Sequence, residues 1–193
     1  MKIAKIVSSN SHIDYIARVI DNVEGSPSQD NYLFGQFVSV DIDAGKVVGV
    51  IYDSRVINPE YSMYGPRLDP KPSLGSFRPE RFSEQSILLG ILLLGTLNAN
   101  GSSQGVPKRI VPPGQDVSAL DPDDLKRFHA DAAGSIHIHY YPQVVAHAGT
   151  FALPLLDSIF ERLSADCSSE DGQRLNVLRR SLAWQGTFGG IRL

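Results

Sequence analysis

Cysteine is almost absent from this sequence, and long uninterrupted apolar runs are missing. Cys167 is the single cysteine among 193 residues, so no internal disulfide can form, which favours a reducing compartment. The longest apolar stretch, Ile87 to Leu97, contains Gly90 and Gly95 and is shorter than the roughly 20 residues of a membrane-spanning helix. The first residues also lack the apolar region of a secretory signal peptide. We therefore expect a cytoplasmic protein without a membrane segment.

The sequence also lacks a phosphate-binding loop. Such a loop needs a glycine, four residues, a second glycine, a lysine and then serine or threonine, so that backbone N–H groups and the lysine surround the phosphates. The Gly45-Lys46 pair is followed by Val47, and Val40 stands where the first glycine belongs. This departure predicts that the chain neither hydrolyses ATP nor binds it tightly, and we expect no cofactor.

Two apolar runs joined by a short turn dominate the first half of the chain. They lie between Tyr32 and Ile57 and meet at Asp43-Ala44-Gly45. Both alternating sets of side chains in the first run are largely apolar, which predicts strands covered on both faces. Gly45 can take the positive φ of a short hairpin loop, whereas Gly35 and Gly49 inside the runs indicate bends or bulges. The pattern predicts a hairpin in a sheet that curls into a small barrel.

The surrounding segments supply further strands and two interruptions. We expect the other strands at Lys2 to Val7, Ile13 to Ile20 and Ser86 to Leu97. A proline-rich excursion at residues 58–80 interrupts them, because prolines fit neither a strand ladder nor a long helix. Asn98 to Gly105 is expected to be a mobile turn. Two prolines followed by a glycine force a tight turn and mark a predicted exit from the barrel at Pro112, Pro113 and Gly114.

Beyond residue 118 the apolar period changes from two to about 3.6, which predicts helices. Asp121 followed by Pro122 is a strong start signal for a first helix, which we expect to end at Gly134. Ser135 to Tyr141 alternates as one short strand. A second helix is expected to bury Phe151, Leu155, Ile159, Phe160 and Leu163, with Pro154 in its first turn, and a third begins near Ser168.

The sequence therefore predicts a β + α fold. A small closed β-barrel occupies residues 1–118 and carries the excursion at 58–80, and a helical appendage with one short strand follows at 119–193. Four glycines and two prolines are expected to be structural because they shape the barrel backbone: Gly35, Gly45, Gly49, Pro112, Pro113 and Gly114.

The order of glycines and valines resembles the HAS barrel, the small N-terminal barrel of HerA-type DNA translocases and of rotary ATP synthase ring subunits. The resemblance covers about the first 118 residues and depends on Gly35, Val38, Val40, Gly45, Val48-Gly49-Val50, Pro112-Pro113-Gly114 and Val117. In that family the barrel precedes an ATPase domain, helps to hold a hexameric ring together and offers a docking surface for a nuclease. Because the ATPase motif is missing here, the resemblance implies a stand-alone, non-enzymatic assembly or adaptor module. Its implied partner is a HerA-like ATPase or a nuclease in DNA processing.

Histidines suggest a different function, a metal-dependent enzyme. His137 and His139 are two residues apart on the expected short strand, so both imidazoles should point to one face, as in metal sites of barrel proteins. His147 would be the third ligand, with His129 or Asp131 as further candidates. Surface or interface histidines explain the same spacing, and both interpretations stay open.

The proline-rich excursion suggests a third function, binding of single-stranded nucleic acid. It combines three aromatic residues with four cations, and rings stack on bases while cations meet phosphates: Tyr61, Tyr64, Phe77, Arg67, Lys71, Arg78 and Arg81. The formal net charge of −3 weighs against broad polyanion binding, and a long surface loop uses the same residues to hold and solvate itself.

A protein partner or self-association is expected from the apolar outer face. A closed barrel has one interior, so the second apolar set of the hairpin and of Ile87 to Leu97 must be covered from outside. The helices can cover part of it, and subunits of an oligomer could cover the rest. Ser102 and Ser103 lie in a glycine-rich context typical of a flexible loop, so we do not assign a hydrolase nucleophile there.

Overall fold

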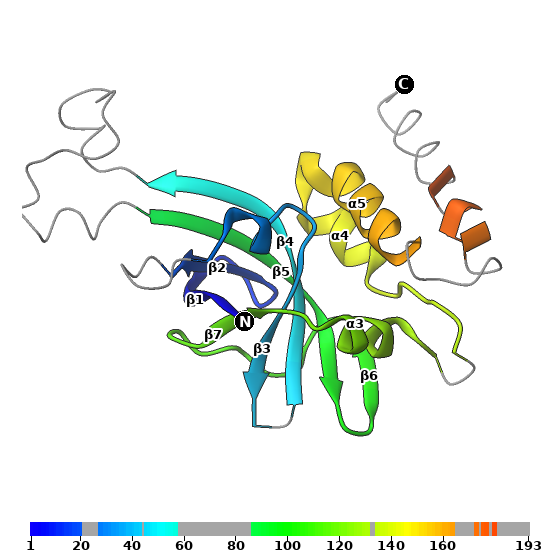
Figure 1. Cartoon of the computed structure of the whole chain (residues 1–193), viewed down its shortest axis with the longest axis horizontal. Coiled ribbons are helices and arrows are strands. Elements are labelled where there is room, and N and C mark those ends of the chain that lie inside the picture. The colour runs from blue at the N-terminus through cyan, green and yellow to red at the C-terminus, as the bar shows by residue number, and fades with distance from the viewer. Residues whose placement is uncertain are drawn as a thin grey trace, which may run out of the picture.

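The computed structural model in Figure 1 describes residues 1–20, 27–43, 45–57, 86–131 and 134–164, with 172–173, 175–177 and 179–180. The proline-rich excursion and Cys167 lie outside these residues, as does most of the expected last helix. The described strands are β1 (Lys2–Ser9), β2 (Asp14–Val19), β3 (Phe37–Ile42), β4 (Gly45–Ile57), β5 (Ser86–Asn98), β6 (Gly101–Gln104) and β7 (Asp116–Ala119). The described helices are η1 (Gln29–Asn31), α3 (Pro122–His129), α4 (Tyr141–His147), η2 (Gly149–Phe151) and α5 (Ala152–Ser164).

The strands form one antiparallel sheet that closes on itself. Its order is β2-β1-β7-β3-β4-β5-β6, and the additional pairing of β2 with β5 closes a barrel of the first six, leaving β6 outside. The expected closed barrel followed by C-terminal helices is therefore confirmed. The barrel was expected to occupy residues 1–118, and its last strand ends at Ala119, but the Pro112-Pro113-Gly114 turn is not the exit: after it the chain forms β7, which is needed between β1 and β3.

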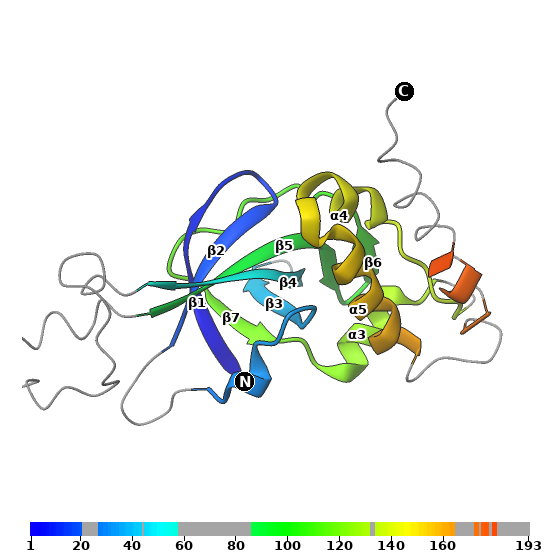
Figure 2. The same ribbon diagram turned by 90° about the horizontal axis from the view of Figure 1, so that it is seen from above.

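Strands β4 and β5 are apolar on both faces, and both faces are covered. Consecutive residues of a strand point to opposite sides, yet Val47 and Val48 on β4 are both buried, as are Leu92 and Leu93 on β5. One side faces the barrel interior. On the other side the buried residues of α3, α4 and α5 belong to the same core cluster. Figure 2 shows these helices gathered at one end of the barrel, opposite the end where β4 and β5 run out.

The covering helices begin where local chemistry predicts. Asp121 caps α3, because its Oδ1 accepts a hydrogen bond of 2.9 Å from the backbone N–H of Asp123, and Pro122 occupies the first helical position. Pro154 lies in the first turn of α5, as expected. Helix α3 ends at His129, well before Gly134, whose φ is +79°.

The expected strand from Ser135 to Tyr141 does not form. Only an isolated bridge between Ala130 and Ile136 remains in the described part of this segment. The reason is Gln104 of β6: its Nε2 donates to the His137 carbonyl and its Oε1 accepts from the His139 N–H. These are backbone groups that a neighbouring strand would have used.

Three further expectations were wrong. The stretch from Asn98 to Gly105 contains β6, because a two-residue turn lets Gly101–Gln104 pair with β5. Strand β3 begins at Phe37 and not earlier, because Gly35 has a φ of +75° and turns the chain. A Cβ at Gly35 would lie 2.1 Å from the Ser158 Oγ, so glycine lets this turn approach α5. Phe151 is 44% exposed rather than buried, because it lies in η2 before α5 begins.

Gly49 lies where β4 and β5 lose register. The pairing shifts between Val48 and Gly49, so the expected irregularity at this glycine is present. A Cβ here would lie 2.8 Å from Ile91 Cγ2 and 3.0 Å from the Leu92 carbonyl oxygen. The site therefore has no room for a side chain, and the neighbouring backbone cannot move without disturbing the ladder.

We predict that Gly49→Val lowers the free energy of unfolding by about 1 to 3 kcal/mol, because an added side chain overpacks the core. Ser54→Val is the matched control, since it adds the same side chain to an exposed position of the same strand. Urea denaturation of both variants gives the comparison. Equal stability of Gly49→Val and the parent would show that the close approach at the bulge does not exist.

Candidate functional site

Two of the histidines singled out from the sequence, His137 and His139, lie in the loop between α3 and α4. His137 and His139 come together, with ring centroids 4.5 Å apart and ring planes tilted by 46°. The His137 Nδ1 is buried and has no hydrogen-bond partner in the structure. Both residues have backbone groups bonded to Gln104, whose Nε2 also donates to the Phe128 carbonyl at 2.9 Å. The pair is therefore held in place by its backbone.

His147 does not complete a metal centre with this pair. It is the last residue of α4 and is exposed. Within the described parts of the chain, no group of three or more His, Cys, Asp or Glu side chains could hold a metal ion. The structure thus joins two of the three predicted ligands and provides no third protein ligand from the described residues.

A buried histidine, His129, lies next to this pair and anchors α3. Its Nδ1 lies 2.9 Å from the Leu125 carbonyl oxygen and its Nε2 lies 2.8 Å from the Tyr140 hydroxyl. The rings of Phe37, Phe128 and Tyr140 surround it at centroid distances of 5.1 to 5.7 Å. The sequence suggested His129 as a further candidate metal ligand. In the structure both of its ring nitrogens have hydrogen-bond partners, the Leu125 carbonyl on α3 and the Tyr140 hydroxyl at the start of α4.

Burial sets the protonation state of this histidine. The pKa of His129 falls from 6.5 to about 4: burial is the main cause, the bond to the Leu125 carbonyl acts in the opposite direction, and the nearby His137 also lowers the pKa. Burial also raises the pKa of the Tyr140 hydroxyl. His129 and Tyr140 are therefore both neutral near pH 7. They join α3, α4 and β3 without burying a charge.

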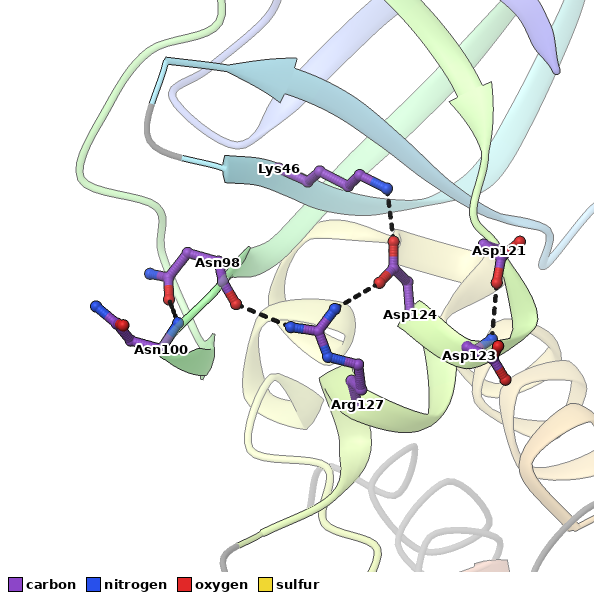
Figure 3. Close-up of polar contacts among 7 residues, drawn as sticks. All are labelled: Lys46, Asn98, Asn100, Asp121, Asp123, Asp124 and Arg127. Carbon is purple, nitrogen blue, oxygen red and sulfur yellow. Dashed lines mark hydrogen bonds and ion pairs between the residues drawn. The ribbon is translucent and has the colours of Figure 1, made fainter.

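An ion-pair cluster holds the first turn of α3 to the barrel (Figure 3). The Lys46 Nζ of β4 lies 2.5 Å from Asp124 Oδ2, and Arg127 Nη1 lies 2.9 Å from the other carboxylate oxygen. Arg127 also donates through Nη2 to the Asn98 carbonyl at the end of β5, at 3.1 Å. One carboxylate thus connects two strands with one helix.

The partners of this cluster shift each other's protonation. The hydrogen bond from Lys46 is the main cause that lowers the pKa of Asp124, and the same bond raises the pKa of Lys46. Because the Asp124 side chain is only 14% exposed, its pairing is shielded better than that of an ordinary surface pair. The cluster therefore holds the first turn of α3 against the barrel. Its charged groups are paired with one another, so we assign it no nucleophile.

Residues Gly101 to Gly105 read Gly-Ser-Ser-Gln-Gly, the letter pattern of a nucleophile elbow around Ser103. An elbow needs a sharp turn from a strand into a helix. Here Ser103 pairs with Thr96 in the ladder between β5 and β6, so the pattern has no catalytic geometry.

The chain is therefore a small β-barrel protein whose own helices cover one end. It belongs to the family described as Domain of unknown function (DUF8166), whose model matches residues 1–192. None of the curated proteins matches the chain. Among the described residues, no helix has the length and apolar character needed to cross a membrane.

We predict a pH dependence that comes from His129. A pKa of about 4 in the folded chain and 6.5 in the unfolded chain means that its contribution is complete above pH 6.5 and is lost as the pH falls toward 4. Between about pH 7 and about pH 5 the parent should lose about 2 kcal/mol of unfolding free energy through this group.

Urea denaturation at both pH values tests the assignment. His129→Gln should lack most of this loss, whatever its absolute stability, whereas the exposed control His147→Gln should keep it. The same pH dependence in the parent and in His129→Gln would contradict the buried neutral state.

Proposed function

We propose that this protein is a non-enzymatic assembly module of the HAS-barrel type that docks on a protein partner. The proposed partner is a HerA-like ATPase acting in DNA processing. The closed barrel is consistent with this class, and the glycine and valine order of the central hairpin suggests it. The ATPase as partner comes from that resemblance alone.

An exposed aromatic pair is the observation that carries the proposal. Phe34, in the turn before β3, and Phe151, in η2, are 39% and 44% exposed, and their rings meet edge to face at 6.0 Å. Leu33 beside them is 48% exposed. The turn lies close to α5 at Gly35, whose N–H donates to the Ile51 carbonyl at 2.8 Å, so hydrogen bonding and packing both position these side chains. Aromatic side chains that are exposed and preorganised are the usual anchors of protein interfaces.

The sequence predicted a partner because the outer face of the barrel needs a cover. In the structure the chain covers this outer face itself. Phe128, Leu155 and Ile159 are fully buried within the single chain. The demand for a subunit to cover β4 and β5 is thereby removed. The aromatic pair with Leu33 is a smaller and more local surface, which suits docking on a partner better than obligate burial.

We predict that Phe34→Glu and Phe151→Glu each weaken binding to a HerA-like ATPase of the same organism by at least about tenfold, because each removes an apolar anchor and adds a charge. Val106→Glu is the control, since Val106 is 59% exposed on the loop after β6. Co-purification followed by titration measures the effect. No complex with the parent protein, or equal binding by all variants, contradicts the proposal.

Metal binding is a second candidate function, favoured by the contact between His137 and His139 and by the unpartnered Nδ1. Imidazole nitrogens bind Zn²⁺, Ni²⁺ and Cu²⁺, and solvent would have to supply the remaining ligands. This site would use two histidines only, which differs from the three expected from the sequence.

Calorimetric titration with Zn²⁺ tests this candidate. We predict one equivalent bound by the parent and by His147→Ala, and at least about tenfold weaker binding by His137→Ala or His139→Ala. Binding that survives both loop substitutions, or no binding by the parent, excludes the pair as a metal site.

A further inference from the structure

Strand β4 extends beyond its neighbour β3 and has an edge that is free among the described residues. The ladder with β3 ends at Val50, and the turn before β3 bonds only as far as Ile51. Beyond this point β5 still pairs with Asp53 to Ile57, but no described strand pairs with the other edge of this segment. Figure 1 shows β4 and β5 running out together from the barrel, away from the helices.

The backbone groups of this edge can be assigned to sides. The Ser54 N–H donates to its neighbouring Asp53 Oδ1 at 2.8 Å, so it points away from β5. Since alternate residues of an antiparallel strand present their N–H and C=O groups to the same side, Ser54 and Val56 face the free edge. Val56 is 80% exposed. An edge with an exposed β-branched residue is a template for pairing with another strand.

A polar contact keeps this edge in position. A register shift between Ile51 and Asp53 makes room for Tyr52, whose hydroxyl donates to Asp14 Oδ1 of β2 at 2.8 Å. The ring crosses β5 at Gly90, where a Cβ would lie 3.2 Å from the Tyr52 Cε1. The three strands are thus joined on their outer face, and the edge of β4 is presented without depending on β3.

The charges on the outer face of this edge have a self-complementary order. Asp53 and Arg55 lie on the same face, on either side of Ser54, and their side chains form an ion pair at 3.2 Å between Nε and Oδ2. Arg55 is 70% exposed. The strand carries an acid, Asp53, before Ser54 and a base, Arg55, after it. A twofold axis at Ser54 reverses this order, so that each Asp53 faces an Arg55.

We propose that two copies of this chain pair through the free edges of β4, antiparallel and centred on Ser54. In this register the two Ser54 residues exchange backbone hydrogen bonds, and each Asp53 lies opposite Arg55 of the second copy. The Asp53 carboxylate then no longer accepts from the Ser54 N–H and forms an ion pair with the Arg55 guanidinium of the other copy. Opposite charges in directly facing positions stabilise a sheet pairing.

The neighbouring registers are unfavourable. A twofold axis at Arg55 places the two guanidinium groups opposite each other, and like charges directly opposite are destabilising. An axis at Val56 places Arg55 opposite Ile57 and leaves Asp53 without a facing cation. The order of charges therefore selects one register, and the interface is isologous, as in a twofold dimer.

This inference deepens the proposed assembly function, on which it rests, by naming a second copy as one partner and β4 as the surface. The two can fail separately. A monomeric parent that binds the ATPase through Phe34 would overturn the β4 pairing and keep the proposed function. A β4 dimer that binds no ATPase would do the reverse.

Light scattering after size exclusion, from about 1 μM to about 100 μM, tests the pairing through the concentration dependence of the mass. The parent should approach the mass of a dimer. Arg55→Asp should remain monomeric, because it places carboxylates opposite each other, and the exchange Asp53→Arg with Arg55→Asp should restore the dimer. Ser54→Pro should also remain monomeric, because it removes the edge N–H without touching the ladder to β5.

Three results would overturn the inference: a monomeric parent, a dimer that persists in Arg55→Asp and Ser54→Pro, or an exchange variant that stays monomeric. Circular dichroism of every variant confirms that the fold is retained. Val106→Lys is a charge control on an exposed loop outside the sheet and should leave the dimer mass unchanged.

Discussion

Two strands that are apolar on both faces impose the main constraint on this protein. Val47 and Val48 on β4 point to opposite sides, as do Leu92 and Leu93 on β5, and each is almost completely buried. The barrel interior can cover only one of the two sides. Leaving the other side in water would forfeit about 25 cal/mol for each Å² of apolar surface, a large loss for a chain of marginal stability. The helices after β7 are therefore part of the core.

The polar contacts of the molecule serve this arrangement. Asp124 ties the start of α3 to β4, and His129 ties its end to Tyr140 without a buried charge. Gly35 lets the turn before β3 approach α5. Because the outer face is covered from within, the surfaces that we propose for partners are the aromatic pair near Gly35 and the overhanging edge of β4.

The parts of the fold that could be predicted from the sequence depend on local or periodic signals. The alternation in β4, the irregularity at Gly49 and the cap at Asp121 each follow from a few adjacent residues. The strand expected at Ser135 to Tyr141 does not form, because the side chain of Gln104, which is distant in sequence, forms hydrogen bonds with backbone groups of that segment. No local pattern contains that information.

The candidate site was predictable only in part for the same reason. The spacing of His137 and His139 suggested proximity, and their rings are close. His147, the expected third ligand, does not lie with them because it is the last residue of α4. The burial of His129 depends on three aromatic rings from separate segments. The free edge of β4 follows from the different lengths of β3 and β4, which the sequence does not specify.

The most direct test of this account is a chain cut after Leu120, which keeps every described barrel strand and removes the helices. Without its cover, the outer face of β4 and β5 should prevent a folded monomer. We expect aggregation, or an expanded species without a cooperative thermal transition, while the full chain unfolds cooperatively. A cut chain that is monomeric and unfolds in one cooperative transition would contradict the claim that barrel and helices share one core.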